Sequence, residues 1–249
     1  MKFPYPLISC LCITKGDPSF LETIIDCFIS QTYPRKELII IYEGSNDFLE
    51  KLDHAEHNIK TYQVALTPKK TLGDLRNMAV SNAEGDYVCQ WDDDDWYHKD
   101  RLLNQYNYSK TDNCAGSILN RWLVYDKSEK VAYLSNERLW EGSILCQKEP
   151  MLQRKYDSLS IGEDTSVIEH LDRNHLLQQM SSSAHLYIYT FHGKNTWDHE
   201  HWSRIFRYST RLSQQQSEVI EKILTGQLNC TEGSLILDDL FSDVYTLIL

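Results

Sequence analysis

Residues 83–96 read Ala-Glu-Gly-Asp-Tyr-Val-Cys-Gln-Trp-Asp-Asp-Asp-Asp-Trp. The apolar run at residues 86–91 predicts a buried strand, and four carboxylates follow it directly. Adjacent carboxylates repel one another, which raises their pKa values or strains the fold, and a bound divalent cation removes this repulsion. Oxygen ligands favour Mg²⁺ or Mn²⁺, so the acid run predicts a metal site. The alternative is a solvated acidic turn ahead of a helix that starts near His98.

The chain before this stretch alternates between predicted strands and helices. Apolar runs predict strands at residues 7–13, 38–42 and 59–64. Helices are predicted from Asp17-Pro18 to Pro34, and over residues 71–83. This alternation predicts an α/β domain with a mostly parallel central sheet flanked by helices. Ligands of such sheets bind beyond the carboxyl ends of the strands, here residues 14–17, 43–47 and 92–95.

The second half of the chain is less regular. We expect a hairpin of residues 117–125 and 130–134, and strands at residues 142–147 and 185–191. Helices are expected over residues 163–171, 200–208 and 213–224. We therefore expect one domain over residues 1–210, with a nucleotide-binding half to about residue 105 and an acceptor half after it. Residues 211–249 form a C-terminal helical appendage to which the sequence assigns no role.

The composition excludes several classes of protein. A net charge of −11 without a basic stripe argues against a nucleic-acid partner. The seven cysteines include no C-x-x-C pair, which argues against zinc or redox motifs and favours free thiols in a cytoplasmic protein. The apolar run at residues 7–13 is too short to span a bilayer and lacks a cleavage site, so we expect no transmembrane segment. Peripheral contact with a membrane stays open.

Taken together, the motifs resemble family 2 glycosyltransferases, which have the GT-A fold of nucleotide-diphospho-sugar transferases. The matching stretches are Ser30-Gln31-Thr32-Tyr33-Pro34, Arg76-Asn77, Ala83-Glu84-Gly85-Asp86-Tyr87 and the acid run. The likeness is continuous over about residues 7–105 and weaker near residues 140–200. It implies a nucleotide-diphosphate sugar donor, with a UDP-sugar slightly favoured, and a Mn²⁺ or Mg²⁺ cofactor.

The resemblance also implies roles for individual residues. Asp94 would bind the metal, Asp92 would lie near the ribose or a metal-bound water, and Asp93 would belong to the donor site. A metal there would neutralise the charge of the diphosphate leaving group. Arg76 either lies near the nucleotide or is an exposed helix charge. At the exit of the first predicted strand, Thr14 could contact the nucleotide.

One position departs from the family pattern. The family has Asp-Asp-Gly-Ser after the second strand, and this chain has Tyr42-Glu43-Gly44-Ser45. Either Glu43 substitutes for the acid that contacts the base, or Tyr42 stacks on the base. The identity of the base therefore stays open.

Glu163 and Asp164 match the Glu-Asp pair of inverting family members. In that family the Asp is the catalytic base, which takes the proton of the acceptor hydroxyl as its oxygen attacks the anomeric carbon. The resemblance thus makes Asp164 the base and places Glu163 in the acceptor site. The alternative is that the pair only caps the helix that follows.

His192 and Trp140 complete the predicted site. Some GT-A enzymes add a late histidine to the metal shell, and His192, just past a predicted strand, is the candidate. Trp140 would stack on the acceptor sugar, although packing in the core is an equal alternative.

These features predict a metal-dependent inverting glycosyltransferase that adds one sugar to a glycan or lipid-linked acceptor. A single addition is favoured because the chain lacks the Gln-x-x-Arg-Trp signature of processive synthases. A catalytically decayed nucleotide-sugar-binding module and a sugar-phosphate nucleotidyltransferase are the alternatives.

Overall fold

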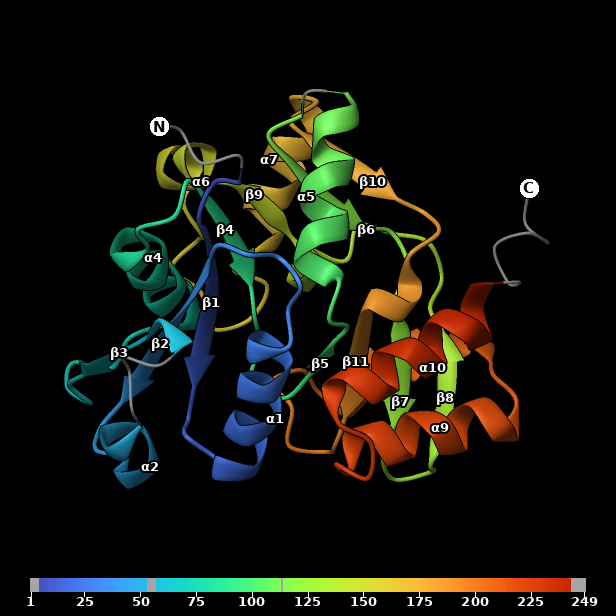
Figure 1. Cartoon of the computed structure of the whole chain (residues 1–249). Helices are drawn as coiled ribbons and strands as arrows, with labels where there is room; N and C mark the ends of the chain where they lie inside the picture. The colour runs from blue at the N-terminus through green and yellow to red at the C-terminus, as the bar shows by residue number, and fades with distance from the viewer. Residues whose placement is uncertain (1–4, 53–56, 113, 243–249) are drawn as a thin grey trace.

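The computed structural model describes residues 5–52, 57–112 and 114–242. They form two β-sheets with helices on their outer faces (Figure 1). The expected C-terminal appendage runs to residue 249, and its last residues, 243–249, lie outside the described ranges. None of the described helices combines the length and the apolar content that a membrane span requires.

The first sheet has seven strands in the order β10-β6-β9-β4-β1-β2-β3. Only β9 runs antiparallel to its neighbours, which confirms the mostly parallel central sheet. The four strands predicted from apolar runs are β1, β2, β3 and β4. The strands are β1 (Ile8–Thr14), β2 (Lys36–Glu43), β3 (Ile59–Val64), β4 (Tyr87–Gln90), β6 (Gly116–Leu119), β9 (Leu145–Gln147) and β10 (Leu177–Met180).

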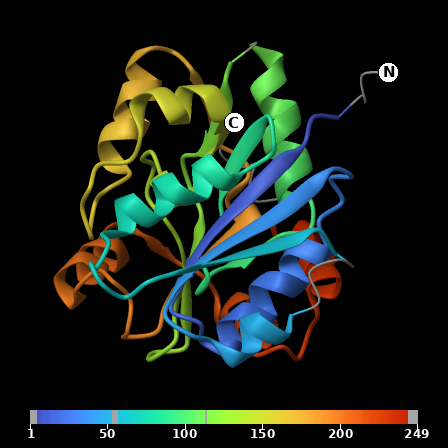
Figure 2. The same cartoon turned by 90° about the vertical axis from the view of Figure 1, so that its left-hand side faces the viewer.

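Helices cover this sheet on both faces, which is why the side chains of its central strands are mostly buried. Helix α4 (Leu72–Asn82) packs on one face, and α1 (Pro18–Ile29) lies on the other (Figure 2). The side chains of β1 alternate accordingly: Leu11 packs with the α4 side, while Cys10 and Cys12 pack with the α1 side. The parallel strands β1, β2 and β4 therefore end at one edge, next to the acid run.

The second sheet has five strands in the order β12-β8-β7-β11-β5. The hairpin of β7 and β8 confirms the expected turn near residues 126–129. The prediction of one strand over residues 117–125 was wrong, because β6 and β7 belong to different sheets and the chain crosses between them at residues 120–122. The strands are β5 (Trp96–Tyr97), β7 (Leu123–Asp126), β8 (Val131–Leu134), β11 (Tyr187–Phe191) and β12 (Thr210–Arg211).

The remaining helices include two that the sequence did not predict, α2 and α6. Helix α2 follows the β2 exit, where Asn46 caps it by accepting a hydrogen bond from the Leu49 amide. The C-terminal helices α9 and α10 cover the second sheet, and their Ile220, Leu237 and Phe241 are buried in its core (Figure 1). These helices are α2 (Asp47–Lys51), α5 (Arg101–Thr111), α6 (Lys148–Arg154), α7 (Thr165–Arg173), α8 (His199–Tyr208), α9 (Gln214–Leu224) and α10 (Cys230–Ser242), with short 3₁₀ turns η1 (Glu141–Ser143) and η2 (Ala184–Leu186).

Candidate active site

The four acids form a loop between the two sheets. β4 ends at Gln90 and β5 begins at Trp96, so residues 91–95 connect a strand of the first sheet to an edge strand of the second. Trp91 and Trp96 are buried at the two ends of the loop, and the indole N–H of Trp91 donates to the Ile24 carbonyl of α1. Buried aromatic side chains on both sides thus fix the position of the acids.

Asp95 points into the protein and anchors the loop. Its Oδ2 accepts a 2.6 Å hydrogen bond from the Tyr187 hydroxyl, and its Oδ1 accepts one of 2.9 Å from the Thr190 amide. Burial, followed by repulsion from Asp94, raises the pKa of Asp95 well above its usual value. Asp95 is thus bound to β11, and the other three acids line the adjacent cavity.

Arg76 on α4 is buried between two of the predicted site acids. Its Nε donates to Glu163 at 2.7 Å, and its NH2 group donates to Asp92 at 2.9 Å. Burial alone would lower the pKa of Arg76, but the Asp92 and Glu163 carboxylates outweigh it and raise that pKa. The alternative of an exposed helix charge is therefore wrong for Arg76, which holds Asp92 and Glu163 in fixed positions.

Asp93 connects the acidic loop to the end of β1. The Thr14 hydroxyl donates to its Oδ2 at 2.5 Å, and the same hydroxyl oxygen accepts from the Gly16 amide. Burial, followed by the charge of Asp94, raises the pKa of Asp93 to about 7. A cation that binds beside Asp93 would therefore stabilise the charged form of its carboxylate.

Asp94 faces His192, which follows β11. The two residues are 98 positions apart in sequence, yet His192 Nε2 lies 3.0 Å from Asp94 Oδ2. The Asn195 side-chain amide also donates to that oxygen, at 3.1 Å. Adjacent ligand atoms on an octahedral ion with bonds of about 2.1 Å lie about 3 Å apart, so the pair fits two neighbouring positions of one divalent cation.

Asp164 lies at the start of α7 and faces the same cavity as Asp92, Asp93 and Asp94. The cavity encloses about 370 Å³ and is bordered by residues from both sheets. Asp164 occupies the N-cap position, but its side chain makes no capping hydrogen bond, which argues against the alternative of a simple helix cap. Burial, followed by repulsion from Glu163, raises the pKa of Asp164 to about 7. That value suits a group that takes a proton near neutral pH.

A search against protein-family models matches residues 9–170, more than half of the chain, to "Glycosyl transferase family 2". The chain belongs to glycosyl transferase family 2. The amylovoran biosynthesis glycosyltransferase AmsB of Erwinia amylovora is 31% identical over 109 residues, 42% of this chain and 36% of AmsB. The cholesterol galactosyltransferase of Borreliella burgdorferi is 34% identical over 108 residues, 42% of this chain and 29% of that protein. The chain spans less than half the length of these curated relatives.

Solved structures share the fold. The crystal structure of S. aureus TarS residues 1–349 in complex with UDP superposes with a TM-score of 0.56 and 16% identity, covering 86% of this chain and 69% of that one. The mannosyltransferase PcManGT of Pyrobaculum calidifontis gives a TM-score of 0.50 at 14% identity, covering 73% of this chain and 60% of that one. This likeness confirms the GT-A fold expected from the sequence.

Two residues that the family pattern suggested for the base lie apart from the cavity. Tyr42 is 5% exposed and packs in the hydrophobic core, and it is absent from the cavity lining. Glu43 also lies outside that lining, and its Oε1 is buried without a hydrogen-bond partner among the residues that the structure describes. The structure therefore brings together Asp92, Asp93, Asp94 and Asp164, but it does not place Tyr42 or Glu43 beside them.

The predicted acceptor residues Trp140 and Glu163 both line the cavity. Trp140 is 2% exposed and packs on Trp122 at 4.4 Å between ring centroids, so it is largely a core residue, with the Arg138 guanidinium 4.6 Å from its ring. Trp140 is thus a core residue that also borders the cavity, and its stacking on an acceptor sugar stays a prediction.

The sequence interpretation missed an exposed aromatic pair beside the cavity. The Trp197 ring is 39% exposed and stacks on His201, with centroids 4.2 Å apart and planes 13° from parallel. Both residues line the cavity, Trp197 from the loop after β11 and His201 from α8. Their spacing, with His201 four residues after Trp197 at a helix start, was the available signal for this pair.

Proposed function

We propose that the chain is a metal-dependent inverting glycosyltransferase that moves one sugar from a nucleotide-diphosphate donor to a glycan or lipid-linked acceptor. One observation carries this proposal: Asp94, the acid paired with His192, lines the same cavity as Asp164. His192 itself lines a second hollow, which also includes Asp93 and Asp94. A cation ligand and a carboxylate base on one cavity are what an inverting transfer needs, because the leaving group is anionic and the acceptor hydroxyl must lose a proton.

Asp94 and His192 would hold the cation, as Mn²⁺ or Mg²⁺. One carboxylate and one imidazole leave most of the coordination sphere to diphosphate oxygens and water, the usual arrangement for such ions in nucleotide sites. The bound cation would neutralise the charge of the departing diphosphate. The mannosyltransferase PcManGT, which shares the fold, is known in complex with GDP-Man and Mn²⁺.

The donor would lie along the edge of the first sheet, near Thr14, Asp92 and Asp93. Solved structures of the fold include complexes with UDP, UDP-GlcNAc and GDP-Man. We favour a UDP-sugar. Arg76 forms ion pairs with two carboxylates and would position Asp92 at the donor. Tyr42 and Glu43 lie outside the cavity lining, so they would affect the binding of the base only indirectly.

Asp164 would take the proton of the acceptor hydroxyl as its oxygen bonds to the anomeric carbon and the bond to the diphosphate breaks. Glu163 and Trp140 would border the acceptor. Trp197 and His201 offer a stacked aromatic face for the apolar side of a sugar ring. The enzyme would meet its donor in the cytoplasm, and a lipid-linked acceptor would bring it to the membrane surface.

Isothermal titration of UDP and of GDP, each with and without Mn²⁺, tests the donor and cation sites together. We expect one nucleotide to bind tightly only when Mn²⁺ is present. Absence of binding by the folded protein under all four conditions would instead favour a decayed module, the alternative that the unusual Tyr42 position suggests. Metal-independent binding would contradict the role of Asp94.

A further inference from the structure

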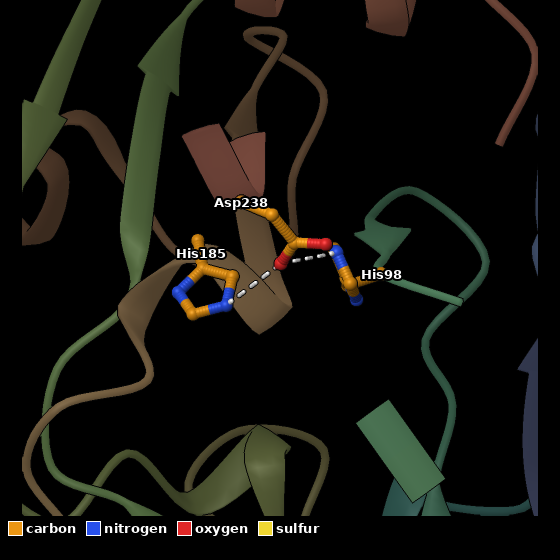
Figure 3. Close-up of side chains that lie close together, drawn as sticks. All are labelled: His98, His185 and Asp238. Carbon is orange, nitrogen blue, oxygen red and sulfur yellow. Dashed lines mark ion pairs between the residues drawn. The ribbon is translucent and has the colours of Figure 1, made fainter. Parts of the chain in front are cut away.

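A second group of potential metal ligands lies outside the acidic loop. His98 follows β5, His185 lies in η2 just before β11, and Asp238 projects from α10 toward both (Figure 3). Asp238 Oδ1 is 3.2 Å from His98 Nε2 and 3.6 Å from His185 Nε2. In the described part of the chain, this is the one place where ligand atoms of three such side chains lie within 4.8 Å of one another.

The two distances from Asp238 match the edges of a small tetrahedron. Four ligand atoms at about 2.0–2.1 Å from Zn²⁺ lie roughly 3.3–3.4 Å apart, and the distances from Asp238 to the two imidazoles bracket that value. His98 is buried, with 1% of its side chain exposed, and His185 shows 15%. Asp238 is 42% exposed, which leaves the open side of the group to a water molecule as the fourth ligand.

The donor set separates this group from the acidic loop. Two imidazoles and one carboxylate suit Zn²⁺ and its neighbours Co²⁺ and Ni²⁺, whereas Mg²⁺ prefers oxygen ligands. Burial lowers the pKa of His98, and it lowers that of His185 to about 4. Both rings are therefore neutral near pH 7, as metal binding requires.

The proton on His98 has to move when a cation binds. The Asp100 amide donates to His98 Nδ1 at 3.1 Å, so Nε2 carries the proton and faces the Ser234 carbonyl and Asp238. Binding at Nε2 shifts that proton to Nδ1, with no net proton released from the ring. The Asp100 carboxylate, 4.0 Å from Nδ1, is placed to accept a hydrogen bond from Nδ1–H after a small rotation, as carboxylates do behind metal-bound histidines. The Asp100 amide then faces Nδ1–H as a second donor, which lowers the affinity of the site.

We propose that His98, His185 and Asp238 form a Zn²⁺ site that fastens the C-terminal helix α10 to the edge of the second sheet. β5 and β11 pair with each other there, and β11 also carries the two groups that hold Asp95 in the acidic loop. The cation would thus act on the structure around the active site without touching substrate. This inference is independent of the proposed transferase activity.

The test measures zinc binding by the full chain through competition with a chromophoric chelator, and repeats it with Co²⁺ by visible absorption. The Asp94→Asn variant removes the catalytic cation site, so zinc bound by that variant reports the second site. In Asp94→Asn we expect one equivalent of zinc, a tetrahedral Co²⁺ spectrum and a raised melting temperature, and in wild type we expect at least that one equivalent. Asp100→Asn should weaken zinc binding by about 10–100-fold.

In the Asp94→Asn background, His185→Gln and Asp238→Asn should abolish the bound equivalent, and His170→Gln, at an exposed histidine of α7, should leave it unchanged. Melting without metal shows whether each variant folds. If His185→Gln does not fold, zinc binding by Asp238→Asn, a change at a partly exposed residue, provides the test. The proposal fails if Asp94→Asn alone removes all zinc binding, or if zinc binding survives both ligand substitutions. The three side chains would then be a hydrogen-bonded contact only.

Discussion

Arg76 and Glu163, 87 residues apart, form a buried ion pair with Nε and Oε1 2.7 Å apart. The same guanidinium reaches Asp92, so one side chain of α4 links the acidic loop to the start of α7. Within residues 5–52, 57–112 and 114–242, neither carboxylate forms an ion pair with a second cation. The spacing between the donor acids and the predicted base therefore depends on Arg76.

Arg76→Ala should destabilise the fold by about 3–5 kcal/mol, because it leaves buried carboxylates without their partner. Urea unfolding monitored by circular dichroism measures the change. Arg154→Ala is the matched control, since Arg154 pairs with Asp157 at a partly exposed site and should cost less than about 1 kcal/mol. Equal losses of stability in the two variants would show that the buried ion pairs of Arg76 stabilise the fold no more than a partly exposed pair does.

Asp94→Asn should remove the Mn²⁺ dependence of nucleotide binding, because a neutral amide is a much poorer ligand for a hard cation. Calorimetry of UDP with Mn²⁺ measures it. Asp86→Asn changes an exposed acid just before β4 and should bind as wild type does. If Asp94→Asn keeps its Mn²⁺-dependent affinity, the cation lies elsewhere.

Asp164→Asn should bind nucleotide normally but lose transfer by about 10²–10⁴-fold, the usual contribution of a general base. Sugar transfer or slow donor hydrolysis, measured beside nucleotide affinity, separates the two effects. A variant that turns over at the wild-type rate would remove Asp164 from the mechanism.

The rate of transfer should fall as the pH drops below about 7, because the raised pKa of Asp164 means that its carboxylate takes up a proton there. Burial and Glu163, Glu141 and Asp92 favour the protonated form, and only Arg76 opposes them. We expect kcat/KM to fall about tenfold for each pH unit below that point. A flat profile between pH 5 and pH 7 would argue for a base with an ordinary carboxylate pKa.

Tyr187→Phe removes the hydroxyl donor of buried Asp95 and should cost about 1–3 kcal/mol of stability. It should also weaken Mn²⁺-dependent nucleotide binding, since Asp95 fixes the loop that carries Asp94. Tyr33→Phe loses a hydrogen bond to the Pro6 carbonyl, far along the chain from the loop, and should affect stability alone. Comparable nucleotide affinity in both variants would show that the hydrogen bond from Tyr187 to Asp95 does not fix the position of the acidic loop.

The sequence predicted β1, β2 and β4 because these segments are mostly apolar, and β3 from a weaker apolar pattern; it also predicted β11 and the hairpin of β7 and β8. It did not predict β10, nor the strands β5 and β12, which contain two residues each, too few to show a period. Asp92, Asp93 and Asp94 were singled out because four adjacent acids after a buried strand are unusual, and Asp164 because Glu163 and Asp164 match the Glu-Asp pair of inverting family members. The burial of Tyr42 was not foreseen, because a motif position does not reveal which face of a strand a side chain occupies.

The amide of Thr190 donates to Asp95 from a strand of the second sheet, while the loop that carries Asp95 leaves from the first. Exchange of that amide with deuterated solvent requires this hydrogen bond to open. The Thr190 amide is therefore a natural reporter: slower exchange on addition of nucleotide and Mn²⁺ would record how strongly the bound ligands hold the two sheets together.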